Sequence, residues 1–147
     1  MLNGRILNEK EAGLLNPVAL AFVGDAVYSL YVRERLSLSG CGRVGDLQRA
    51  AGGIVSAKTQ SELLDKLIPL FTNVESEIFR RAKNAKKAAK SKSASSLEYN
   101  RSTGFEAVMG YLYLTGQEER IRELLSVMGE EDFAIPERKT PFKPGLL

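Results

Sequence analysis

Histidine and tryptophan are absent from this sequence of 147 residues, and it contains a single cysteine, Cys41. Without histidine, the chain cannot form a Ser-His or Cys-His catalytic pair or a zinc site that uses histidine. A single cysteine cannot form an internal disulfide, which is typical of proteins from the cytoplasm. Any catalysis or metal binding must therefore use carboxylates, lysines, hydroxyls and bound water.

Long apolar runs are missing as well. No stretch is long enough to cross a bilayer, and the first residues, MLNGRILNEKEAG, contain no apolar signal-peptide core. We therefore expect a cytoplasmic protein that does not interact with a membrane. The length and the hydrophobic content of 44% fit one globular domain over residues 1–147.

Apolar residues recur at helical spacing, and no strand-like alternation of any length is present. The first half of the chain predicts a helix from Pro17 to about Leu36, with Asn16 as its N-cap. A helical segment over 44–68 follows, with a bend at the Gly52–Gly53 pair. The pattern thus predicts an all-α fold.

The second half predicts three more helices, which begin near Asn73, at Ser102 or Thr103, and near residue 117. Residues 90–100 are rich in Ser, Ala and Lys and are expected to form a solvated loop. Residues 130–147 contain three prolines and are expected to be an irregular tail. The core of the helical bundle should therefore lie within residues 16–128.

Two carboxylates interrupt the most apolar helices. Asp25 lies in ALAFVGDAVYSLYV and Glu106 in STGFEAVMGYLYL, each beside glycines that would let two helix backbones approach closely. A buried carboxylate usually pairs with Arg or Lys, takes up a proton, or binds a metal, and a salt bridge is the commonest explanation for a lone Asp. Two such acids in two core helices instead favour a shared cation. Oxygen ligands suit Mg²⁺, with Mn²⁺ as a plausible substitute.

Basic residues are concentrated in one stretch. From Arg80 to Arg101 the net charge is +7, with Glu98 as the one acid, whereas the whole chain carries +3. This asymmetry indicates a polyanionic partner, although a charge run can also be only a solvated surface. The candidate side chains for contact with this polyanion are Arg80, Arg81, Lys83, Lys86, Lys87, Lys90, Lys92 and Arg101.

A divalent cation beside a polyanion can activate water against a phosphate. Because the basic stretch directly precedes the helix of Glu106, these residues together point to metal-assisted phosphodiester chemistry. Asp25 and Glu106 are the candidate catalytic and metal-binding residues.

The same residues resemble the endonuclease domain of the ribonuclease III family. The segment AFVGDAVYSLYV is similar to its first motif and STGFEAVMGYLYL to its second, and the resemblance covers about residues 16–128. Ordinary members carry further acids at positions that here hold Val18, Ala21 and Thr103. This reduced set, with no room for a double-stranded-RNA-binding domain, resembles the Mini-ribonuclease III group.

The resemblance implies a Mg²⁺-dependent, homodimeric endoribonuclease in which Asp25 and Glu106 hold the metal. It implies double-stranded RNA as substrate, chiefly the ends of the 23S ribosomal RNA precursor, and products with 5′-phosphates. A ribosomal protein that presents the RNA is a further expected partner. Two alternatives stay open: a non-catalytic RNA-binding or ribosome-associated protein, and a helical interaction protein whose acids form internal salt bridges.

Overall fold

The computed structural model describes residues 2–39, 43–85 and 96–133, and these residues form helices without any strand. The all-α class expected from the sequence is therefore confirmed. In chain order the elements are α1 (Glu9–Gly13), α2 (Pro17–Leu38), α3 (Val44–Ile54), α4 (Ala57–Leu67), η1 (Ile68–Leu70), α5 (Asn73–Asn84), α6 (Ser96–Leu114), α7 (Glu118–Leu125) and η2 (Glu130–Phe133).

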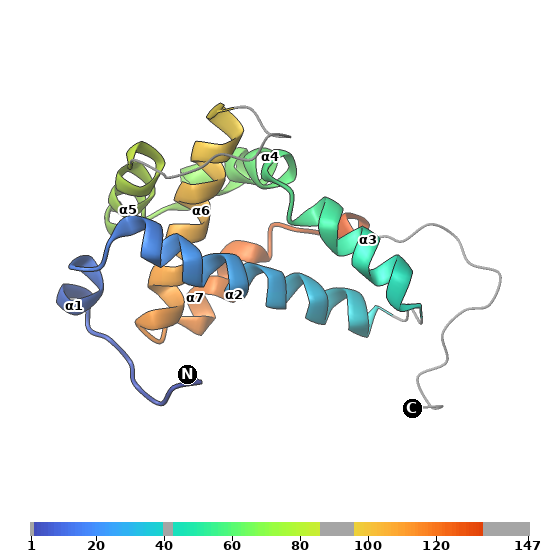
Figure 1. Ribbon diagram of the computed structural model, residues 1–147, viewed down its shortest axis with the longest axis horizontal. Helices are drawn as coiled ribbons and strands as arrows, with labels where there is room; N and C mark the ends of the chain where they lie inside the picture. The colour runs from blue at the N-terminus through green and yellow to red at the C-terminus, as the bar shows by residue number, and fades with distance from the viewer. Residues whose placement is uncertain (1, 40–42, 86–95, 134–147) are drawn as a thin grey trace.

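The two longest helices, α2 and α6, cross each other and form the most extensive contact between any two elements (Figure 1). Glycine makes this crossing close. A Cβ added to Gly24 would lie 1.6 Å from the carbonyl oxygen of Glu106, and one added to Gly110 would lie 1.9 Å from that of Leu20. Only hydrogen fits at these two positions, so the two backbones touch directly.

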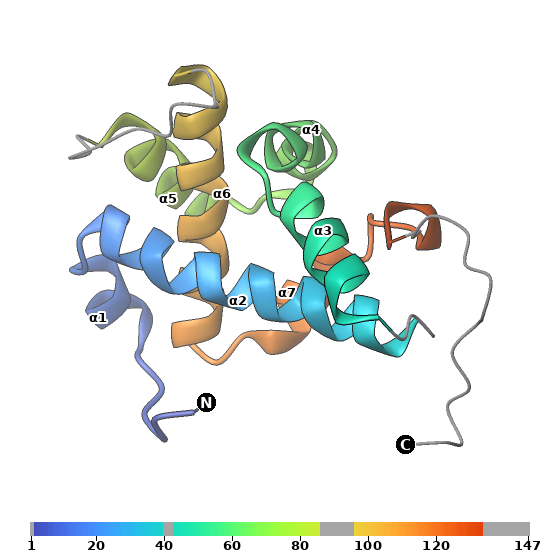
Figure 2. The ribbon, with the colours of Figure 1, turned by 45° about the vertical axis from the view of Figure 1, so that its right-hand side comes forward.

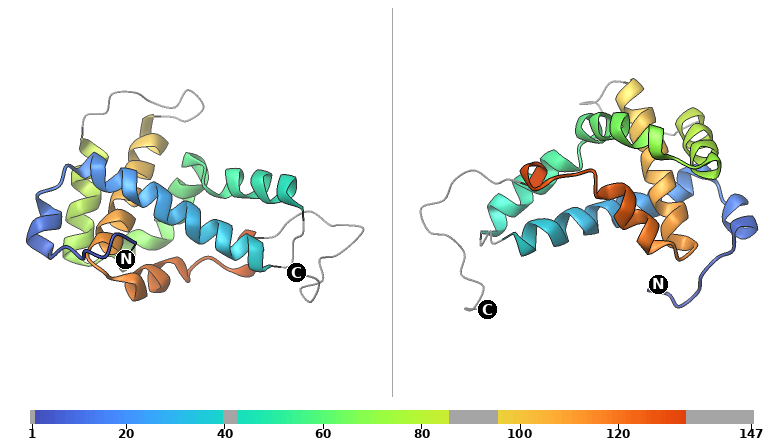
Figure 3. Two further views of the ribbon diagram at one scale, coloured as in Figure 1. Left: turned by 60° about the horizontal axis from the view of Figure 1, so that its bottom comes forward. Right: turned by 180° about the vertical axis from the view of Figure 1, so that it is seen from behind.

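The other helices pack around this crossing. Helices α4 and α5 lie against α6, while α3 lies along the second half of α2 (Figure 2). Seen from behind, α7 and η2 cover the remaining side, and η2 reaches both α2 and α3 (Figure 3). In the centre, the rings of Tyr28 and Phe105 meet edge to face with centroids 4.9 Å apart, and both side chains are fully buried.

Several helix ends differ from the sequence-based expectation. Helix α5 is capped by Thr72 rather than Asn73, because Thr72 and Glu75 form a reciprocal capping box. Helix α6 begins at Ser96, about six residues earlier than expected, so that Ser102 and Thr103 lie inside it rather than at its cap. Residues 96–100, the last part of the expected loop, are therefore helical. Contacts with the rest of the fold override their weak local preference.

The bend expected at Gly52–Gly53 comes slightly later. Both glycines belong to α3, and the chain turns at Val55 before Ser56 caps α4. The tail is also not irregular from its start, since Glu130–Phe133 forms a 3-10 helix in which Phe133 is buried. An aromatic side chain at this position gains more by packing against Tyr31 than by staying in water.

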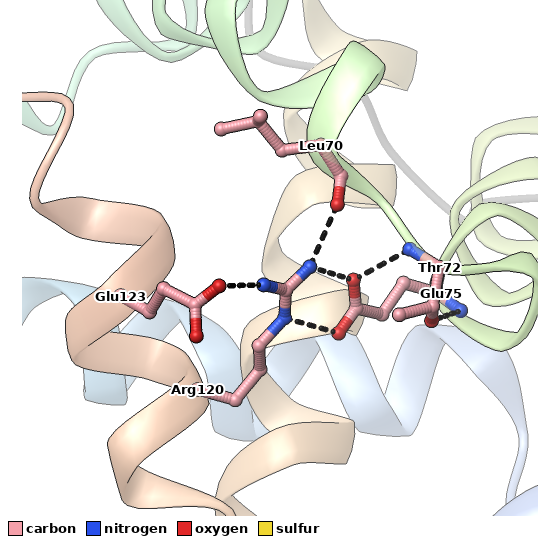
Figure 4. Close-up of polar contacts among 5 residues, drawn as sticks. All are labelled: Leu70, Thr72, Glu75, Arg120 and Glu123. Carbon is pink, nitrogen blue, oxygen red and sulfur yellow. Dashed lines mark hydrogen bonds and ion pairs between the residues drawn. The ribbon is translucent and has the colours of Figure 1, made fainter.

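A buried ion pair joins α5 to α7 (Figure 4). Glu75 is 3% exposed and accepts hydrogen bonds from Nε and Nη2 of Arg120 at 2.9 and 2.8 Å. The same guanidinium donates to the carbonyl oxygen of Leu70 at 2.7 Å and to Glu123 at 2.6 Å. Burial by itself would raise the pKa of Glu75, but the hydrogen bonds from Arg120 and the Thr72 amide outweigh it and hold that pKa below 4.5.

Within the described residues, no helix is both long enough and apolar enough to cross a membrane.

Candidate active site

Asp25 and Glu106 meet at the crossing of α2 and α6. Asp25 follows Gly24, the residue whose backbone lies against the carbonyl oxygen of Glu106. The glycine contact therefore determines how closely the two acids approach, and Asp25 lies near enough for its charge to raise the pKa of Glu106. The structure thus brings together the two carboxylates that the sequence singled out, although they lie about eighty positions apart in the chain.

The burial of Asp25 and Glu106 differs from that expected of two buried acids. Glu106 is half-buried, but Asp25 is exposed. Helix α2 places Leu20, Gly24, Tyr28 and Val32 on its core side, so Asp25 and the 82% exposed Phe22 lie on its outer side. The apolar residues around Asp25 in the sequence are therefore not all core residues, and the expectation that Asp25 is buried is wrong for the single chain.

The electrostatics of Glu106 reflect this arrangement. Burial, followed by the nearby charge of Asp25 and the hydrogen bond with it, raises the pKa of Glu106 to about 8. A hydrogen bond from Ser102 acts in the opposite direction. Among the described residues, no Lys or Arg side chain forms an ion pair with either acid. Two adjacent carboxylates without a basic partner are a suitable environment for a divalent cation.

The donor set fits Mg²⁺ rather than a metal that needs a full protein cage. Over residues 2–39, 43–85 and 96–133, no group of three or more His, Cys, Asp or Glu side chains could hold a metal ion. Mg²⁺ is commonly held by one or two carboxylates while it keeps several waters and binds substrate phosphate. Asp25 and Glu106 would therefore supply the protein ligands, and solvent and RNA would supply the rest.

Two hydroxyls next to Glu106 have different roles. The Ser102 Oγ donates to Glu106 Oε1 at 2.9 Å, whereas Thr103 Oγ1 donates to the carbonyl oxygen of Tyr99 at 3.0 Å. The sequence-based expectation placed Ser102 at the start of the helix and missed this contact. The signal was the spacing of four residues between Ser102 and Glu106, which places both side chains on one face only if α6 already includes Ser102.

The basic residues of α5 lie on a helix that packs against the helix of Glu106. A Cβ at Gly104 would lie 2.6 Å from the Phe79 ring, and Arg80 and Arg81 follow Phe79. Arg80 forms two hydrogen bonds to Glu77, at 3.0 and 2.6 Å, and Arg81 forms a long one of 3.5 Å to the Gly13 carbonyl.

The other predicted RNA contacts are distributed unevenly. The Lys83 ammonium lies 5.6 Å from the centroid of the Phe79 ring. Arg101 connects α6 to α4, donating to Ser61 at 2.8 and 2.9 Å and to Asp65 at 2.7 Å, so its guanidinium has a structural role. The remaining four predicted contacts lie outside the described residues: Lys86, Lys87, Lys90 and Lys92. Contact of these basic residues with RNA stays a prediction.

Comparison with known proteins agrees with this geometry. The ribonuclease III domain matches residues 18–117, a region that includes both acids. A Mini-ribonuclease 3 of Symbiobacterium thermophilum is 47% identical over 116 residues, which cover 79% of this chain and 89% of that protein. The Mini-ribonuclease 3 of Brevibacillus brevis is 41% identical over 128 residues, which cover 87% and 92%.

A solved structure shares the fold as well. The crystal structure of a protein from Fusobacterium nucleatum aligns with a TM-score of 0.71 and 31% identity, covering 76% of this chain and 91% of that one. The matches in sequence and in structure both span most of the chain. The chain therefore belongs to the ribonuclease III family, within its Mini-ribonuclease 3 group.

Proposed function

We propose that this endoribonuclease of the ribonuclease III family hydrolyses phosphodiester bonds of double-stranded or structured RNA with the help of Mg²⁺ bound by Asp25 and Glu106. Mn²⁺ is the expected substitute. The observation that carries the proposal is the close backbone crossing of α2 and α6 at Gly24, which brings Asp25 near Glu106 without a basic partner for either acid among the described residues. The natural substrate we propose is the 23S ribosomal RNA precursor, trimmed at both ends.

The two acids would have different roles in the reaction. Asp25 is exposed, so an RNA phosphate can approach it without any opening of the fold. Glu106 is half-buried and tied to Ser102, so it provides a fixed oxygen behind Asp25. When bound, Mg²⁺ lowers the pKa of a coordinated water and neutralises charge on the phosphate. Because burial and Asp25 raise the pKa of Glu106, this side chain must release a proton before it can act as a ligand.

The RNA would be held through its backbone. A-form duplexes present phosphates and 2′-hydroxyls across a wide minor groove, and the basic stretch from Arg80 to Lys92 is the source of positive charge nearest in sequence to α6. Affinity should fall steeply with salt, by about 0.7–0.9 log units per log salt for each phosphate neutralised. We expect weak sequence preference from such contacts.

A homodimer is part of this proposal. The outer side of α2 exposes Phe22 and Leu30, which is costly for a single chain in water. A second copy seated on this face would bury both side chains and place the two Asp25 sites beside one interface, where both stay open to RNA. Each site would then cut one strand of a duplex and leave 5′-phosphate products. We place the enzyme in the cytoplasm, with a ribosomal protein that presents the precursor as a further partner.

The proposal can be tested with a double-stranded RNA and the purified protein. We expect cleavage that EDTA stops and that added Mg²⁺ restores. Asp25→Asn should lower the cleavage rate by at least about 100-fold, the upper end of the loss that follows when a metal ligand loses a hydrogen-bonding partner, because it removes a ligand itself. The matched control is Glu34→Gln, which removes an exposed carboxylate from the same helix and should cleave normally. Normal cleavage by Asp25→Asn would exclude the assigned site, and RNA binding without any cleavage would favour a non-catalytic RNA-binding protein.

A further inference from the structure

Ser102 is a buried hydroxyl whose hydrogen bond goes to an active-site side chain. The residue is 7% exposed, and its Oγ donates to Glu106 Oε1 at 2.9 Å. Both residues belong to α6 and lie one helical turn apart, so the same rigid element sets their spacing. The contact thus depends on side-chain torsions alone and not on any loop.

The hydrogen bond of the Ser102 hydroxyl differs from those of the nearby threonine hydroxyls. Serine and threonine inside helices usually donate back to a carbonyl four residues earlier. Thr103 follows that rule with Tyr99, and Thr115, directly after the end of α6, donates in the same way to Tyr111 at 2.7 Å. Ser102 instead donates to a carboxylate, so its hydroxyl is available to orient a side chain rather than to satisfy the backbone.

The backbone around Glu106 is already immobilised from several sides. Phe105 packs on Tyr28, Gly104 touches Phe79, and the Glu106 carbonyl lies against Gly24. The freedom that is left lies in the torsions of the Glu106 side chain, which can rotate about three bonds. A donor that holds one carboxylate oxygen removes much of this freedom and keeps the group facing Asp25.

We propose that Ser102 is a positioning residue of the active site, which holds the Glu106 carboxylate in the orientation that lets it share a divalent cation with Asp25. This role rests on the function proposed above. The inference goes beyond that function, because it assigns a supporting residue that would touch neither the cation nor the RNA. Hydrogen bonds to ligating carboxylates are a common way of tuning metal affinity, and losing one typically costs 10- to 100-fold.

The test measures Mn²⁺ binding to the RNA-free protein by electron paramagnetic resonance, alongside thermal unfolding. We expect Ser102→Ala to raise the dissociation constant for Mn²⁺ by roughly tenfold while the melting temperature of the metal-free protein stays close to that of the parent. Ser102→Cys keeps a weak donor of similar size and should give an intermediate dissociation constant. Thr103→Val removes the adjacent buried hydroxyl, which does not contact Glu106, and should bind Mn²⁺ as the parent does.

Each outcome separates this inference from the proposed function. If Asp25→Asn weakens Mn²⁺ binding but Ser102→Ala does not, the metal site stands and the role of Ser102 is rejected. If Thr103→Val weakens binding as much as Ser102→Ala, the effect is a general one of buried hydroxyls and the inference is again rejected. If Asp25→Asn binds Mn²⁺ like the parent, the metal assignment fails and the role of Ser102 fails with it.

Discussion

Gly24 on α2 lies against the carbonyl oxygen of Glu106 on α6, so that a Cβ at Gly24 would come within 1.6 Å of that oxygen. No rotation of a side chain can relieve such an overlap, since both partners are backbone. The same contact that packs the two longest helices therefore also sets the separation of the two catalytic candidates, because Asp25 follows Gly24 directly.

Gly24→Ala is expected to damage both stability and activity. A methyl group forces the α2 and α6 backbones apart, and overpacking of this kind usually costs about 1–3 kcal/mol or more. Denaturant unfolding measures the loss of stability, and the RNA cleavage assay measures the loss of activity. Gly52→Ala is the matched control, because nothing lies within 4 Å of the added Cβ and alanine favours the helix interior by roughly 1 kcal/mol. Unchanged stability of Gly24→Ala would contradict the close crossing.

Arg120→Met is expected to lower the free energy of unfolding by about 3 kcal/mol, because it leaves the Glu75 carboxylate buried without its partner. Arg122→Met removes an exposed arginine from the same helix and should lower the free energy of unfolding far less, since surface ion pairs contribute little. Urea titration at neutral pH compares the two variants. Equal losses in the two variants would show that the ion pair of Figure 4 is not the stabilising contact.

Acid should weaken the parent protein through Glu75. Its pKa is held below 4.5 in the folded state, so its contribution is present above that pH and disappears as pH falls through the lowered value. Glu75→Gln should therefore be less stable than the parent at neutral pH, and the difference in stability should narrow as pH falls below 4.5. Unfolding curves of both proteins from neutral pH into the acid range test this prediction. A stability difference that widens in acid would contradict it.

Metal-free protein should lose stability as pH rises from 4.5 towards 8. Folded Glu106, with a pKa of about 8, keeps a proton that the unfolded chain releases near the usual value of 4.5. Glu106→Gln removes this dependence. Near pH 8.5, the melting temperature of Glu106→Gln should exceed that of the parent by roughly 2–4 °C for each kcal/mol gained in the free energy of unfolding. Near pH 4, the two melting temperatures should differ little. Adding Mg²⁺ should stabilise the parent but not the variant, and a parent that is insensitive to Mg²⁺ argues against the site.

Phe22→Gln is expected to shift the protein from dimer to monomer. The side chain is 82% exposed on the outer side of α2, three residues from Asp25, and would be a central contact of the proposed interface. Leu97→Gln is the control, because it removes a large exposed side chain from α6 instead. Light scattering coupled to size-exclusion chromatography gives the mass. A dimer that survives Phe22→Gln unchanged would place the interface elsewhere.

Part of the site was accessible from residue pattern alone. Asp25 and Glu106 stand out because a carboxylate in an apolar helix needs compensation, and the flanking glycines indicated a close approach. The pattern did not show that Asp25 is exposed, because α2 is apolar on nearly every side and periodicity cannot reveal which side the core covers. The roles of Ser102 and Arg101 were likewise hidden, since the helix was expected to begin only at Ser102 or Thr103.

The amino-acid sequence by itself determined the helical class, most helix positions and the identity of the two acids, because these depend on local periodicity, capping residues and chemical type. Only the tertiary structure decided that Asp25 is exposed, and that Glu75 pairs with Arg120 and Arg101 with Asp65. Such pairs join residues that are 36 or more positions apart, and their geometry arises only when whole helices pack. Packing depends on the complete set of buried surfaces and not on any local segment.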